Sequence, residues 1–96
     1  MVYYTVRCDP APGKVEELDR LLTGAGKQFW TSQAGVAEYH VYGDKLLGWP
    51  ERTITIGVRD MASLQKVLDS EGRQRVRKEF LGYVSRTEAQ IQELIV

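Results

Sequence analysis

The chain contains one histidine, the residue type most often used for proton transfer at physiological pH. His40 is the only histidine among the 96 residues, and Glu38 and Tyr42 lie two positions to either side of it. An imidazole can accept or donate a proton at physiological pH, so His40 is the candidate catalytic residue. The alternative is a half-buried histidine that hydrogen-bonds across a sheet or a subunit contact. A metal site is not expected, because one His and one nearby carboxylate supply too few ligands.

Two tryptophans could wall a binding pocket for a flat molecule. Trp30 follows Phe29 in a helical pattern, and Trp49 lies in a loop that contains Gly48 and Pro50. Indole rings stack on planar ligands and donate one hydrogen bond, so both are candidate ligand-binding residues. The structural alternative is that Trp30 closes one end of the core and that Trp49 anchors the loop or a partner chain.

The remaining reactive side chains have simpler explanations. Cys8 has no neighbouring histidine to activate it, so we expect it in the core. Arg7 would form an ion pair with Glu88 if the first and last strands are neighbours. The basic residues between positions 73 and 78 are flanked by acids, which is typical of a solvated helix face.

The charge balance excludes several classes of partner. The 13 basic and 13 acidic residues cancel, whereas nucleic acids and anionic membrane surfaces attract proteins with a basic excess. No apolar run approaches the roughly 18 residues of a membrane span, and no signal-peptide pattern is present. The single cysteine excludes an internal disulfide. We therefore expect a cytoplasmic protein that forms one domain over residues 1–96.

Strands and helices alternate along the chain. Period-two patterns predict strands over residues 1–8, 36–42 and 52–59. Apolar residues at intervals of three and four predict one long helix over residues 14–33, closed by Gly35. Asp60 and Ser70 are expected to begin the two pieces of a second helical region.

The C-terminal segment has two interpretations. Propensity favours a helix over residues 86–95, but we assign a strand, because without it the sheet would have only three strands. Strand, helix, strand, repeated twice, is the split βαβ arrangement. The predicted fold is therefore α+β and ferredoxin-like, a four-stranded antiparallel sheet with both helices on one face.

The second face of such a sheet would remain uncovered. We expect it to carry Tyr3, Thr5 and Arg7 from the first strand, and Thr53, Thr55 and Gly57 from the third. These residues are neither charged like a solvated face nor apolar like a core. A domain of this length buries less than about two-thirds of its unfolded surface. We therefore predict a homodimer in which two such faces pack together.

Three segments carry a resemblance to a known family. They are Pro12-Gly13-Lys14 at the entry to the first helix, the strand from Gly35 to Tyr42, and the passage from Ile54–Val58 into Asp60–Leu64. In these segments the chain resembles the dimeric α/β-barrel proteins that include the antibiotic-biosynthesis monooxygenase-like domains. The resemblance implies a dimeric α/β barrel. For function it implies a cofactor-independent monooxygenase acting on aromatic phenols, a haem-degrading enzyme, an isomerase or a ligand-binding domain.

The sequence leads to one main functional hypothesis and two alternatives. The hypothesis is a monooxygenase-like small-molecule enzyme or binder without a tightly held cofactor, which takes an aromatic or otherwise oxygenated compound. Its pocket would lie between the sheet and the helices, lined by Trp30, His40 and Tyr42, with Arg52 or Trp49 at the mouth. One alternative is a non-catalytic ligand-sensing or structural homodimer. The other is haem binding or degradation, which the absence of asparagine disfavours, because the family's haem-degrading triad includes one.

Overall fold

The segments rich in β-branched and aromatic residues form four antiparallel strands. They are β1 (Val2–Pro10), β2 (Val36–Gly43), β3 (Arg52–Val58) and β4 (Val84–Glu93). In the computed structural model, which describes residues 1–96, the strands are ordered β2-β3-β1-β4. This is the strand order of two interleaved βαβ units, so the predicted α+β, ferredoxin-like fold is confirmed.

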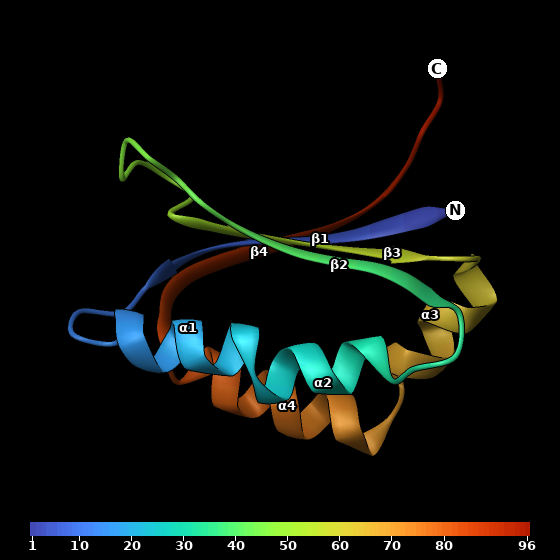
Figure 1. Cartoon of the computed structure of the whole chain (residues 1–96), viewed down its shortest axis with the longest axis horizontal. Helices are drawn as coiled ribbons and strands as arrows, with labels where there is room; N and C mark the ends of the chain where they lie inside the picture. The colour runs from blue at the N-terminus through green and yellow to red at the C-terminus, as the bar shows by residue number, and fades with distance from the viewer.

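All the helices lie on one side of this sheet (Figure 1). They are α1 (Val15–Thr23), α2 (Ala25–Thr31), α3 (Met61–Leu68) and α4 (Glu71–Leu81). Helices α1, α2 and α4 run beneath the strands, and α3 lies at the end of the sheet near the start of β2. The core forms between the two layers, where Leu18, Ile56 and Leu64 are fully buried. None of the helices is long and apolar enough to cross a lipid bilayer.

The strand register decides which side chains face the helices. Tyr4 pairs with Ile56 on one side and with Ile91 on the other, and alternate residues of a strand point to opposite faces. Tyr4 and Ile56 therefore face the helices, whereas Thr5 and its partner Thr55 face away. The face without helices is the one predicted from the sequence, and we call it the open face.

The first helical region differs from the prediction. It consists of two helices that meet at Gly24 (φ −112°, ψ −106°) instead of one continuous helix. A Cβ atom at this position would lie 2.7 Å from the carbonyl oxygen of Arg20, so the bend requires glycine. Helix α2 ends at Thr31 with Ser32 as its C-cap, so Gly35 does not cap it. Gly35 instead adopts a φ of 89° in the turn that leads into β2.

Local signals in the second half of the chain are confirmed. The Asp60 carboxylate accepts a hydrogen bond from the Ser63 backbone N–H (2.8 Å) and begins α3. The Ser70 hydroxyl does the same for the Arg73 N–H (3.2 Å) at the start of α4. The ambiguous C-terminal segment is a strand, because the edge of β1 offers it backbone partners over almost its whole length.

Candidate functional site

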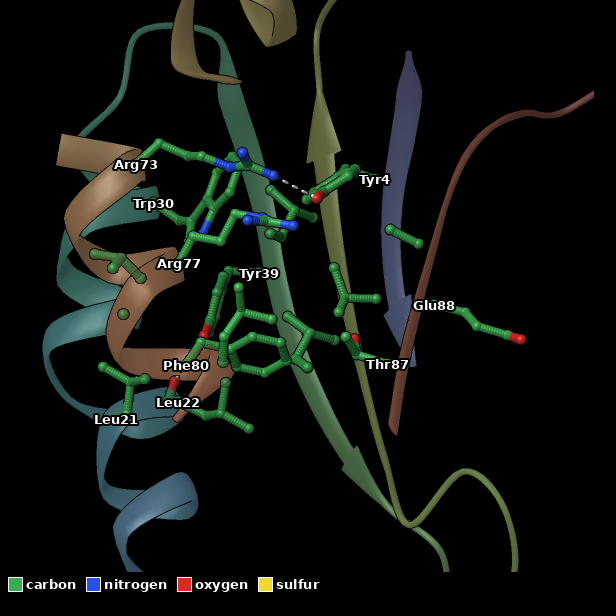
Figure 2. Close-up of a pocket in the computed structure, with 17 residues that line it drawn as sticks. Tyr4, Leu21, Leu22, Trp30, Tyr39, Arg73, Arg77, Phe80, Thr87 and Glu88 are labelled. Atoms are coloured by element: carbon green, nitrogen blue, oxygen red, sulfur yellow. Dashed lines mark hydrogen bonds between the residues drawn. The ribbon is translucent and has the colours of Figure 1, made fainter. Parts of the chain in front are cut away.

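A cavity of about 300 Å³ lies between the sheet and helices α1, α2 and α4. Its walls are mostly apolar, and four aromatic residues contribute to them: Tyr4, Trp30, Tyr39 and Phe80. Figure 2 shows these rings converging from β1, α2, β2 and α4. A concave, largely apolar space with a few polar groups is the usual form of a small-molecule site.

The aromatic wall is held by ring-to-ring packing. The ring centroids of Tyr4 and Trp30 lie 5.7 Å apart, and Phe29 meets the edge of Trp30 at 5.5 Å. Offset and edge-to-face pairs at these separations are favourable. Trp30 is only 7% exposed. Its indole is therefore held in place by the surrounding side chains.

The two tyrosine hydroxyl groups of the cavity differ in whether their proton already has a hydrogen-bond acceptor. The Tyr39 hydroxyl donates to the Leu22 carbonyl oxygen (2.7 Å), and burial raises the pKa of Tyr39 to about 12. Tyr39 is thus a neutral group whose proton is already engaged. The Tyr4 hydroxyl oxygen instead accepts a hydrogen bond from Nη2 of Arg73 (3.1 Å).

Two arginines of α4 give the cavity a positive end. Arg73 and Arg77 are four residues apart, on the helix face that also presents Val76 and Phe80 to the cavity. Neither guanidinium forms an ion pair, since the three ion pairs of the structure involve other residues. Glu88 is the only acidic residue in the lining, and Figure 2 shows its side chain pointing away.

The sequence interpretation missed Arg73 and Arg77, which it assigned to a solvated helix face. Arg73 is half-buried in the cavity wall, and Arg77 is exposed at the mouth. The signal was present in the spacing. Positions 73, 76, 77 and 80 follow the i, i+3, i+4, i+7 pattern of a single helix face. The position of the two arginines on this face, and not their charge, indicates where they lie.

The expected pocket of Trp30, His40 and Tyr42 does not form. Trp30 lines the cavity, but His40 and Tyr42 lie on the open face, in register with Thr55 and Thr53. Their own ring centroids are 6.1 Å apart. The physical reason is the alternation of β2, which turns the intervening apolar side chains toward the helices to fill the core.

Arg52 and Trp49 do not form the mouth of the cavity. Arg52 makes two hydrogen bonds to the Asp19 carboxylate (2.8 and 2.9 Å), which tie β3 to α1 and raise the pKa of Arg52 further. The ring of Trp49 packs under the Arg86 guanidinium at 3.8 Å. With Tyr42 it lines a separate hollow of about 220 Å³ beside the β2–β3 loop.

Comparison with known proteins finds matches in structure but not in sequence. No protein-family model and no curated protein matches the sequence. Solved structures do match. A putative antibiotic biosynthesis monooxygenase from Deinococcus radiodurans is 17% identical, with a TM-score of 0.85 over 98% of this chain and 92% of that one. A second, from Nitrosomonas europaea, is 10% identical with a TM-score of 0.79 over 100% of both chains.

The fold is that of the antibiotic biosynthesis monooxygenase-like domains. Rv0793 from Mycobacterium tuberculosis shares it as well, at 17% identity and a TM-score of 0.83 over 99% of this chain and 95% of that one. At these identities the likeness concerns the fold, and a shared fold does not fix an activity. The chemistry of this chain has to be argued from its own cavity.

A metal site and a haem site can each be tested against the residues present. No group of three or more His, Cys, Asp or Glu side chains is arranged to hold a metal ion. A haem in the cavity would find no imidazole there, because His40 is on the other side of the sheet. The groups that the cavity does present are aromatic rings and the two arginines.

Two further expectations have clear outcomes. Cys8 is fully buried, and burial together with the Asp9 charge raises its pKa to about 12, so it is the core residue that was predicted. The prediction of an Arg7–Glu88 ion pair is wrong. The two residues pair in register, but Arg7 Nη1 donates to Oε1 of Gln90 (2.6 Å) and Glu88 lies 3.5 Å from Arg86.

Proposed function

We propose that the cavity binds a planar, oxygenated aromatic molecule and that the protein oxidises it with O2 without a bound cofactor. The observation that carries the proposal is the cavity itself, a space of about 300 Å³ walled by Tyr4, Trp30, Tyr39 and Phe80. Flat rings packed against such walls bury apolar surface and gain stacking contacts. The solved structures described as monooxygenases support the choice of reaction.

The reaction needs no reductant if the substrate supplies the electrons. A phenol with an activated ring methylene ionises to an electron-rich anion that O2 can oxidise. The methylene becomes a carbonyl, one oxygen atom enters the product, and the other leaves as water with the two methylene hydrogens. The guanidinium groups of Arg73 and Arg77 favour the anion, because a nearby positive charge lowers the pKa of a phenol.

An oxygen electrode tests this proposal with 1,8-dihydroxyanthrone, a tricyclic phenol with such a methylene. We expect the wild-type protein to consume O2 above the uncatalysed rate and the variant Trp30→Leu to lose this excess. Trp49→Phe is the matched control, since Trp49 lies outside the cavity. A wild-type rate equal to the background with this phenol would contradict the oxidation.

One observation favours a second candidate, a ligand-sensing module without catalysis. No histidine lines the cavity, and the single acidic residue in the lining, Glu88, points away from it. The lining therefore supplies neither a histidine nor an inward-pointing carboxylate as a general base. Saturable binding of 1,8-dihydroxyanthrone without O2 consumption would identify this function instead.

We further propose that the protein is a homodimer formed through the open face. The β2–β3 loop and the C-terminal segment rise at opposite ends of this face (Figure 1). They carry strongly exposed apolar side chains, among them Leu46, Leu47 and Ile95. A second copy related by a two-fold axis would cover both the sheet and these residues. A proton-transfer role for His40 would require a ligand on this face.

A further inference from the structure

We infer that the ligand is an aromatic oxyanion and that its charged oxygen is bound by the Tyr4 hydroxyl, held and polarised by Arg73. This inference rests on the proposed function of the cavity and assigns its polar end. The Tyr4 oxygen accepts from Arg73 Nη2 at 3.1 Å, so the proton of the Tyr4 hydroxyl remains to be donated. A ligand oxygen next to Tyr4 would receive it.

Tyr4 is the only cavity hydroxyl with a proton that no protein group accepts. Three hydroxyl-bearing residues line the cavity: Tyr4, Tyr39 and Thr87. Tyr39 donates to the Leu22 carbonyl oxygen (2.7 Å), and Thr87 donates to the Arg7 carbonyl oxygen (3.0 Å). Both protons are engaged with the backbone, which leaves Tyr4 as the donor for a ligand.

The charge around Tyr4 selects an anion over a neutral oxygen. Arg73 contacts the phenol directly, and the guanidinium of Arg77 extends from the next turn of α4 toward the same space (Figure 2). No carboxylate neutralises either of them. Hydrogen bonds to a charged oxygen are about twice as strong as those between neutral groups. An anionic ligand therefore gains more here than its neutral counterpart.

The position of Tyr4 also orients the ligand. Figure 2 shows Tyr4 and Arg73 at one end of the cavity and Leu21, Leu22 and Phe80 at the other. A ligand with its oxygen at Tyr4 would extend its rings toward these apolar side chains. The arrangement fits a molecule with one charged end and a flat hydrocarbon body, such as an aromatic phenolate or carboxylate.

Three naphthalene probes separate charge from ring packing in a calorimetric titration. They are 2-naphthoate, which is an anion, 2-naphthol, which can ionise, and the neutral 2-methylnaphthalene. We expect the wild-type protein to prefer 2-naphthoate to 2-methylnaphthalene, and Tyr4→Phe or Arg73→Gln to weaken 2-naphthoate binding by about tenfold. The binding of 2-methylnaphthalene should change little.

The ionisation of bound 2-naphthol, followed by absorption, is a second measurement. A loss of ring packing alone would not change its pH midpoint. Ionisation changes the absorption of 2-naphthol, and we expect its pH midpoint to fall by about one pH unit when it is bound to the wild-type protein. Tyr4→Phe and Arg73→Gln should move the midpoint back toward the free value. The controls are Tyr3→Phe, which removes a hydroxyl from the open face, and Arg75→Gln, which removes a charge outside the cavity lining.

The outcomes distinguish this inference from the proposed function. If Tyr4→Phe and Arg73→Gln bind 2-naphthoate like the wild type while Trp30→Leu loses it, the cavity is the site but the oxyanion assignment is overturned. If Trp30→Leu binds every probe like the wild type, the proposed function itself fails. Arg73 lies in the first turn of α4 and is only half-buried, so we expect Arg73→Gln to fold. This variant therefore tests the inference even if Tyr4→Phe does not fold.

Discussion

Trp30 and His40 lie on opposite faces of the sheet. Trp30 packs beneath the strands against Tyr4, with ring centroids 5.7 Å apart, whereas His40 pairs in register with Thr55 on the open face. The molecule therefore carries two separate surfaces of functional interest. One is an aromatic cavity between the sheet and the helices, and the other is a polar sheet face that we propose as a subunit contact.

The separation of Trp30 from His40 predicts independent effects of substitution. We expect His40→Ala to leave the affinity for 2-naphthoate unchanged, because the sheet separates the imidazole from the cavity. Trp30→Leu should weaken binding by at least about tenfold, since it removes a stacking wall. Calorimetric titration measures both. A large loss of affinity in His40→Ala would show that the ligand contacts the open face.

The proposed dimer predicts a change of mass when charge is placed at the centre of the open face. Thr55 lies between Thr5 and His40 in register, so Thr55→Arg would set unpaired charges against the partner copy. Light scattering after size exclusion should show a dimer for the wild type and a monomer for Thr55→Arg. Lys66→Glu, on the exposed side of α3, is the control. A wild-type monomer at micromolar concentration would refute the dimer.

The Arg52–Asp19 contact predicts a measurable contribution to stability. Asp19→Asn keeps the shape but removes the charge from a two-hydrogen-bond ion pair. We expect the free energy of unfolding in urea to fall by about 1 kcal/mol, because Asp19 is partly exposed and solvent screens the interaction. Glu16→Gln, an exposed acid of the same helix, should have a smaller effect. Equal effects of the two variants would argue against a specific role for the pair.

The buried Tyr39 predicts a loss of stability at alkaline pH. Its pKa is raised from 10.0 to about 12 in the folded protein, so between these values the folded state holds a proton that the unfolded state has released. The stabilisation is complete below pH 10 and is lost as the pH rises toward 12. Cys8, whose pKa is raised from 9.0 to about 12, acts in the same direction.

Comparison with Tyr39→Phe isolates the tyrosine from the cysteine. The variant keeps the Cys8 contribution but has no phenol to ionise. We therefore expect its free energy of unfolding to fall less steeply than that of the wild type between pH 10 and pH 12. Parallel pH dependences in urea titrations would mean that Tyr39 is not the group responsible.

Most of the fold could be read from local patterns. Strand alternation, the Asp60 and Ser70 caps and the uncovered face follow from spacings of two and three residues. The bend at Gly24 could not be read in this way, because the apolar stripe continues across it. The strand at the C-terminus was recovered from topology, since only the free edge of β1 overrides the helical propensity of the segment.

The candidate site was only partly predictable. Trp30 lay on a recognisable helical stripe, and its place in the cavity follows from that stripe. The alternation of β2 also shows which face His40 is on. The predicted pocket failed because it combined His40 with Trp30, which lies on the other side of the sheet. The Tyr4–Arg73 hydrogen bond joins residues that are 69 positions apart. No local pattern reports such a contact.

The most direct test of the central claim uses the two indole N–H signals in a nitrogen–proton correlation spectrum. Trp30 lines the cavity, and Trp49 lies outside it beside Arg86. The variant Trp49→Phe assigns the two signals. We expect titration with 2-naphthoate to shift the Trp30 indole signal to saturation and to leave the Trp49 signal in place. A shift of the Trp49 signal alone, or of neither, would contradict ligand binding in the cavity.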